Sequence, residues 1–218
     1  MTTIQKIASQ ISPYMEKQGY KLSKNCFYKI QDDMALCVQF DCPGGFVYAT
    51  FFVMPLYIPC QNRYYTYGNR VNSLRHSKTQ PLSADSSDNA ITKWCKILCR
   101  DLETIVFLFF REIATPKQLI TAVEKKRYLA GPFFSCPDVQ VFRLLMFSYL
   151  YTEKFEKLSL TIADYLQIIQ NSTFLTKPVR DQYSHEAEAV QVLAQGNIQD
   201  CRDFCIHTIA NTLSTLQL

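Results

Sequence analysis

The hydrophobic pattern of this chain changes its period along the sequence, and that change limits the folds the chain can adopt. Three runs, over 20–30, 34–40 and 46–55, have strand character: the first mixes polar and apolar residues, the second is nearly continuously apolar, and the third is dense in aromatic and β-branched residues. Short turn sequences separate them, Gln31-Asp32-Asp33 and Pro43-Gly44-Gly45. Runs of this kind joined by tight turns are typical of an antiparallel β-meander. The pattern therefore predicts a small antiparallel sheet of three to four strands.

Apolar residues recur at helical spacing on both sides of that predicted sheet. Pro13 is expected to kink the first helix or to restart it with Ser12 as N-cap, and Gly19 is expected to end it. That first helix is predicted from the spacing of Ile4, Ile7, Ala8, Ile11 and Met15. After the sheet, helices are predicted over 90–111, 115–127, 139–151, 155–169, 181–195 and 197–217. The second of these is expected to start at a capping box, with Thr115 as N-cap and Gln118 at N3.

These patterns predict an α+β fold: an N-terminal helix and a small antiparallel meander packed on helices, followed by a mostly helical C-terminal half. Residues 1–76 are expected to form the helix and sheet, and 77–89 an exposed polar loop. Residues 90–218 are expected to form a helical bundle or a set of helical hairpins. Because so small a sheet needs apolar cover, we expect all parts to pack as one compact unit.

The nine cysteines are an odd number without regular spacing, so they do not predict a disulfide framework. Residues 1–19 lack the continuous apolar stretch of a secretory signal. The longest apolar run, 105–110, is far shorter than the roughly 20 residues that a membrane span needs. We therefore expect free thiols, a cytoplasmic location and no membrane partner.

Residues with catalytic or metal-binding chemistry do not form a recognisable motif. Cys95 and Cys99 are four residues apart, as are Cys201 and Cys205, but both pairs fall in apolar stripes where cysteine is a common core residue. The pair His185-Glu186 lacks the second histidine of a metalloprotease. The sequence predicts no metal, no cofactor and no catalytic residue. A hydrolase or thiol enzyme whose site assembles only in the fold stays open as an alternative.

Three short segments carry a resemblance to a known family. A helix is followed by Gly19-Tyr20-Lys21-Leu22, then by Phe27-Tyr28-Lys29-Ile30, then by Val38-Gln39-Phe40. This arrangement resembles a bacterial domain family of unknown function, number 4304, over the first third of the chain. The resemblance implies an α+β fold and a bacterial or phage origin, and it implies no activity. Small bacterial proteins of this appearance include immunity proteins that bind toxins, which favours protein binding by analogy.

Charge is unevenly distributed although the net charge is only +4. No Asp or Glu occurs between Cys42 and Ala84, whereas tyrosines and arginines alternate there. Tyrosine and arginine are the usual energetic anchors of protein interfaces. The predicted binding residues are Tyr57, Arg63, Tyr64, Tyr65, Tyr67, Arg70 and Arg75.

The leading hypothesis is a non-enzymatic protein-binding module, in the manner of a bacterial immunity or antitoxin-like inhibitor, that uses this segment against an acidic protein partner. An alternative is nucleic-acid binding through 57–78, because the same residue types stack on bases and neutralise phosphates. A further interpretation is an ordinary solvated edge loop whose tyrosines cover the sheet.

Overall fold

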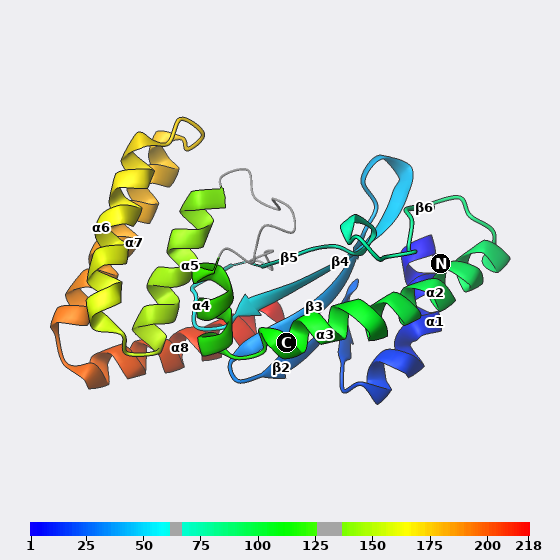
Figure 1. Ribbon diagram of the computed structural model, residues 1–218, viewed down its shortest axis with the longest axis horizontal. Helices are drawn as coiled ribbons and strands as arrows, with labels where there is room; N and C mark the ends of the chain where they lie inside the picture. The colour runs from blue at the N-terminus through cyan, green and yellow to red at the C-terminus, as the bar shows by residue number, and fades with distance from the viewer. Residues whose placement is uncertain (62–66, 126–136) are drawn as a thin grey trace.

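The computed structural model describes residues 1–61, 67–125 and 137–218. The fold is α+β, as the hydrophobic pattern predicted: a helix, an antiparallel sheet and then a mostly helical C-terminal half. Figure 1 shows helices α2 (Asp88–Asp101) and α3 (Phe107–Glu112) running in line along the sheet, with the upright helices of the C-terminal half beside it.

Helix α1 (Thr3–Lys17) begins at a capping box in which the Thr2 hydroxyl accepts from the Gln5 N–H and the Gln5 side chain accepts from the Thr2 N–H. The predicted restart at Ser12 is wrong, because α1 continues through Pro13 without a break. The Ser12 hydroxyl instead donates to the Ala8 carbonyl inside the helix. Proline has no N–H to bond the carbonyl four residues before it. Because Pro13 lies on the exposed side of the helix, water can bond that carbonyl instead.

The predicted meander is confirmed and has more strands than the three to four expected. The mixed run 20–30 divides into two strands at Lys24, whose φ of 57° allows a tight turn. Paired antiparallel neighbours follow the order β1-β2-β3-β4-β5, and β6 also pairs with β4. The strands are β1 (Lys21–Ser23), β2 (Cys26–Gln31), β3 (Met34–Asp41), β4 (Phe46–Pro55), β5 (Tyr67–Arg70) and β6 (Leu82–Ser83).

The first face of the sheet packs on α1, α2 and α3. Its largest contacts join aromatic rings: Phe40 meets Trp94 with centroids 6.3 Å apart, and Phe51 meets Phe109 at 5.1 Å. Rings of this size each bury about 150–250 Å², so this face forms the main core. Its other buried strand residues include Phe27, Leu36, Val38, Val47, Ala49 and Val53.

The second face has a different cover. Helix α8 (Ile198–Leu216) brings its last turns against this face, where Leu216 is buried. Strand residues turned toward α8 alternate with those of the first face, as the two-residue period of a strand requires. They are Cys26, Tyr28, Ala35, Cys37, Phe52 and Met54.

The helix predicted over 90–111 is one continuous helical run, but its hydrogen-bond pattern changes at η3 (Leu102–Val106), a π-helical segment between α2 and α3. Buried residues lie four apart through it, at Leu98, Leu102, Val106 and Phe110. In a regular α-helix each step of four advances about 40° beyond a full turn, which would carry later members off the sheet. The wider i→i+5 turn of η3 offsets that rotation and keeps all four side chains in the core.

The remaining helices follow the predicted ranges closely. Helix α4 starts at the predicted capping box of Thr115 and Gln118. The Arg143 guanidinium bonds both carboxylate oxygens of Glu186 at 2.6 Å and the Pro59 carbonyl at 2.9 Å, and so joins two helices to the end of the sheet. These helices are α4 (Pro116–Glu124), α5 (Pro137–Tyr151), α6 (Phe155–Asn171) and α7 (Lys177–Gln195).

The polar segment 77–89 is mostly exposed, yet it is anchored at one buried carboxylate. One oxygen of Asp101 accepts from the hydroxyls of Ser77 and Thr79 and from the backbone N–H groups of Lys78 and Thr79, at 2.7 to 2.8 Å. Burial acts to raise the pKa of Asp101, but these hydrogen bonds outweigh it and hold the pKa below its ordinary value. The loop is therefore fixed to the end of α2.

Among the described residues, no helix is long and apolar enough to cross a membrane.

Candidate functional site

The tyrosines predicted to form a binding surface are placed in the core where the structure describes them. Tyr57 is fully buried, bonds Ser148 through its hydroxyl at 3.0 Å and stacks on Tyr151 with centroids 4.3 Å apart. Tyr67 is 5% exposed and stacks on Phe109. Neither ring can anchor a partner on the surface, because its area is already buried inside the protein. The prediction is wrong for these two residues.

Of the three predicted arginines, the structure describes Arg70 and Arg75. Arg70 lies with its guanidinium 4.0 Å above the Tyr48 ring and 3.6 Å from the Asp41 carboxylate, so a neighbouring charge offsets its own. Arg75 is exposed on the following loop. Arg63, Tyr64 and Tyr65 lie outside the described residues.

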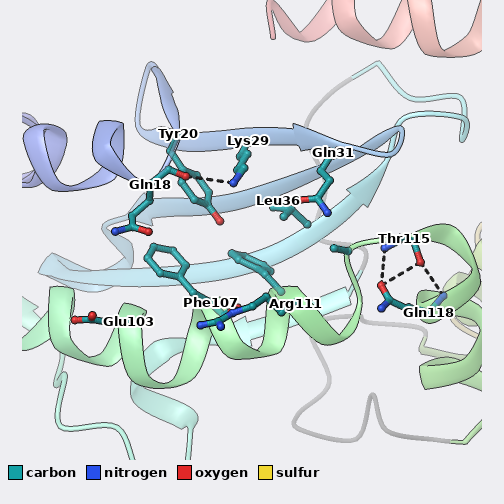
Figure 2. A pocket seen from close by; sticks show the side chains of 12 residues that line it. Gln18, Tyr20, Lys29, Gln31, Leu36, Glu103, Phe107, Arg111, Thr115 and Gln118 are labelled. Atoms are coloured by element: carbon teal, nitrogen blue, oxygen red, sulfur yellow. Dashed lines mark hydrogen bonds between the residues drawn. The ribbon is translucent and has the colours of Figure 1, made fainter.

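A different site lies between the first face of the sheet and α3. A cavity of about 520 Å³, here called the sheet–helix cavity, opens where α1 ends and α3 continues. Its volume is within the range of sites that hold small ligands or single side chains of a partner. Figure 2 shows residues from the α1–β1 turn, β2 and β3 facing residues of α3 and the start of α4 across it. The lining is Gln18, Tyr20, Lys29, Gln31, Leu36, Glu103, Phe107, Phe110, Arg111, Ala114, Thr115 and Gln118.

The cavity exists because α1 ends early and turns sharply. The Gly19 N–H bonds the Glu16 carbonyl and the Tyr20 N–H bonds the Met15 carbonyl, which is the Schellman arrangement. Gly19 has a φ of 81°, a conformation that side chains disfavour, so glycine suits this position. The turn leaves part of the first face without a helix above it and directs Tyr20 toward α3.

The floor of the cavity is apolar and aromatic. Tyr20 stacks on Phe107 with centroids 5.5 Å apart and meets Phe110 at 6.5 Å. Phe107 is the most exposed of the three rings, whereas Tyr20, Phe110 and Leu36 are buried beneath it. Burial raises the pKa of Tyr20 well above its ordinary value, so its hydroxyl stays protonated and can only donate or accept as a neutral group.

Two cations from different elements border this floor. Lys29 of β2 donates from Nζ to the Gln18 carbonyl at 3.3 Å, and Arg111 of α3 donates from Nε to the Phe107 carbonyl at 3.3 Å. Within the three described stretches of the chain, neither cation forms an ion pair. Their remaining N–H groups and both full charges are therefore available to an anionic ligand.

The two ends of the cavity differ in charge. Thr115 and Gln118 form the wall at the start of α4, where each side chain bonds the other's backbone N–H. The positive end of the α4 dipole thus adds to the potential near Arg111, although its donors are occupied. Glu103 lies farther along the helical run toward α2, and the Arg111 side chain reaches back to the Phe107 carbonyl.

The thiols that the sequence singled out lie apart from this cavity and are poorly suited to nucleophilic chemistry. Burial, with the neighbouring thiol of each pair, raises the pKa of Cys95 and of Cys205 to about 12. A thiol with so high a pKa is protonated near neutrality and is a weak nucleophile. Over the part of the chain that the structure describes, no three His, Cys, Asp or Glu residues gather as a metal site.

Sequence reasoning missed the cavity because its lining comes from three distant segments. The signals closest to it were Gly19 as a helix stop and the Thr115–Gln118 capping box, both of which are confirmed. Lys29 and Arg111 are ordinary surface cations when each is considered alone. Only the packing of α3 across β2 brings them to one site.

Comparison with known protein families, with curated proteins and with solved structures gives no match for this chain. The resemblance of its first third to domain family 4304 stays a prediction.

Proposed function

We propose that this chain is a non-enzymatic binding protein that recognises an acidic partner protein through the sheet–helix cavity. The observation that carries the proposal is the pair of cations, Lys29 and Arg111, which border an apolar floor without an ion-pair partner among the described residues. An acidic side chain placed between them would form charge-assisted hydrogen bonds, each contributing about 1.5–3 kcal/mol in favourable geometry.

The lining favours binding over catalysis. Among the described residues of the lining there is no cysteine and no histidine, and the Thr115 hydroxyl already takes part in the helix cap. Nucleophilic catalysis needs a nucleophile beside a base, and general acid–base catalysis needs a titrating group near the reacting atoms. Glu103 alone does not supply that arrangement. The hydrolase and thiol-enzyme alternatives therefore receive less support at this cavity.

Charge also favours a protein partner over nucleic acid. A nucleic-acid groove needs a positive surface that follows several phosphates. Here the carboxylate of Glu103 lies in the same cavity as the two cations, and Asp41 offsets Arg70 on the predicted basic segment. One localised anionic group suits this distribution better than a continuous polyanion does.

The test is affinity capture from cell extract with the tagged chain, quantified by mass spectrometry. We expect one dominant acidic protein, recovered by the wild type and lost with Lys29→Glu combined with Arg111→Glu. The matched control is Lys21→Glu with Arg100→Glu, which makes the same charge change at exposed positions outside the lining. The control should retain the partner.

Two results would contradict the proposal. Equal recovery by the cavity variant and the wild type would remove the cavity from recognition. Recovery that disappears after nuclease treatment would favour the nucleic-acid alternative instead.

A further inference from the structure

We infer that the sheet–helix cavity binds one anionic group carried on a flat apolar body, such as an aromatic carboxylate, with the anion between Lys29 and Arg111 and the body against Phe107. This inference rests on the proposed function and specifies the chemistry of its site. The same chemistry can come from a side-chain pair of the acidic partner or from a free small acid, and the experiment below separates these sources.

The order of residues along α3 gives the cavity a direction. Glu103, Phe107 and Arg111 are spaced by four and all line the cavity, so they form a row in which an acid, a ring and a base follow one another. The Arg111 side chain reaches back one turn to the Phe107 carbonyl, so the base lies beside the ring and less than two turns from the acid. A ligand about the size of one ring with a short acidic arm can therefore contact Phe107 and the guanidinium together.

The platform for the ring is already ordered before a ligand arrives. Phe107 is held by its stack on Tyr20, and Phe110 and Leu36 are buried around them. A flat group laid on Phe107 would gain aromatic contact worth about 0.5–1.5 kcal/mol beyond its area burial. Little rearrangement would oppose binding, because the packed core already holds the rings that form the floor.

The donors suit a carboxylate better than a phosphate. The N-terminus of α4 lacks an N–H at Pro116, and the Gln118 N–H is bonded to Thr115, so the helix end presents few backbone donors. The charge must therefore be matched by two side chains, of which Arg111 offers a planar fork. At the far end, Glu103 repels any second negative group, which selects against dianions and polyanions.

The experiment measures binding of defined probes to the full chain by protein-observed NMR titration. The probes are 3-phenylpropionate, its neutral amide, phenyl phosphate and 1,4-phenylenediacetate, which carries an acid at each end. For the wild type we expect 3-phenylpropionate to bind at least tenfold more tightly than each of the other three. The shifted resonances should belong to the residues that line the cavity.

Three variants test the assigned roles. Lys29→Gln with Arg111→Gln should weaken 3-phenylpropionate at least tenfold and leave the amide unchanged. Glu103→Gln should leave 3-phenylpropionate unchanged and strengthen 1,4-phenylenediacetate at least threefold. Lys21→Gln with Arg100→Gln, outside the lining, should change neither. The inference would be overturned if the acid and its amide bound equally well. It would also be overturned if the affinity for 3-phenylpropionate were unchanged in Lys29→Gln with Arg111→Gln.

Competition with the captured partner separates the two sources and the two proposals. Release of the partner by 3-phenylpropionate supports the inference with the partner as the source of the anion. Acid binding without release supports a free small acid as the ligand and refutes the cavity's role in partner recognition. Loss of the partner with Lys29→Glu and Arg111→Glu, without any acid binding, refutes this inference and leaves the proposed function standing.

Discussion

The two faces of the sheet are covered by different amounts of helix. The first face presents rings such as Phe40 and Phe51 to three helices. The second face presents residues of mixed size, from Ala35 to Phe52, to the last turns of α8. A face covered by three helices buries more apolar area than a face covered by the end of one helix, so its cover is held by more contacts.

This difference indicates where stability and function are located. Local unfolding starts where few apolar contacts hold an element, so the end of α8 should open before α2 or α3 does. The sheet–helix cavity lies on the better-covered face, at the margin where α1 stops. Binding residues at this margin are attached to the most rigid part of the molecule, so the positions of Lys29 and Arg111 relative to each other stay constant.

The largest expected effect compares Phe51 with Phe52, neighbours on β4 that face opposite sides of the sheet. Phe51→Ala should lower the free energy of unfolding by about 3–5 kcal/mol, because its contacts with Phe109 and Phe110 leave little room for collapse. Phe52→Ala should cost at least about 1 kcal/mol less, since α8 can shift to fill the space. Urea unfolding measures both, and equal costs would break the comparison.

The next effect concerns Asp101, the carboxylate that fixes the polar loop to the end of α2. Asp101→Asn should cost about 1.5–3 kcal/mol at neutral pH, because hydrogen bonds to a charged acceptor are lost. The folded pKa of Asp101 is below its ordinary value, so this stabilisation is present above about pH 4 and is lost as pH falls through the folded pKa. The free energies of unfolding of variant and wild type should converge in acid. A difference that stays constant with pH would show that the ionised carboxylate is not the source of the stabilisation.

A smaller effect is expected at the second face. Leu216→Ala should cost about 1–2 kcal/mol, at or below the lower end of the usual range because the side chain lies at the end of a terminal helix. The same change should speed the reaction of Cys26 and Cys37 with a thiol reagent and leave Cys95 of α2, in the core on the other side of the sheet, unchanged. Equal acceleration at all three cysteines would mean global unfolding rather than release of α8.

The smallest effect tests whether the two cations at the cavity contribute to the stability of the fold. Lys29→Gln with Arg111→Gln should change the free energy of unfolding by no more than about 0.5 kcal/mol, because neither side chain has an ion-pair partner in the described residues. Thermal unfolding of variant and wild type measures this difference. A cost above about 1 kcal/mol would show that the two cations serve the fold.

The sequence predicted the elements well because each depends on local signals. The turn residues Asp32 and Asp33 adopt positive φ, and the Thr115–Gln118 cap starts its helix as expected. Strand pairing also followed from chain order, since short turns leave only antiparallel neighbours. The division of the run 20–30 at Lys24 was missed, because no glycine or asparagine-glycine pair marks that turn.

The candidate site could not be predicted for a physical reason. Tyr57 and Tyr67 look like interface residues in composition, and only the three-dimensional packing shows that α5 and α3 already cover them. Conversely, Lys29 and Arg111 are 82 positions apart in the numbering, and nothing local links them. The packing of α8 on the second face could not be predicted either, because it joins segments far apart in the sequence. The apolar stripe of that helix predicts a buried face but not what covers it.

The π-helical segment η3 also determines where the helical run can change its length. A segment of this kind is what one added residue produces inside an α-helix. Removing a single exposed residue there, such as Thr104, would restore regular hydrogen bonding without turning the helix beyond it, because eleven regular steps from Leu98 to Phe110 end about 20° past whole turns. Phe110 would stay on the sheet, and Phe107 and Arg111 would stay at the cavity. This stretch should therefore accept the loss of one residue at its outer surface.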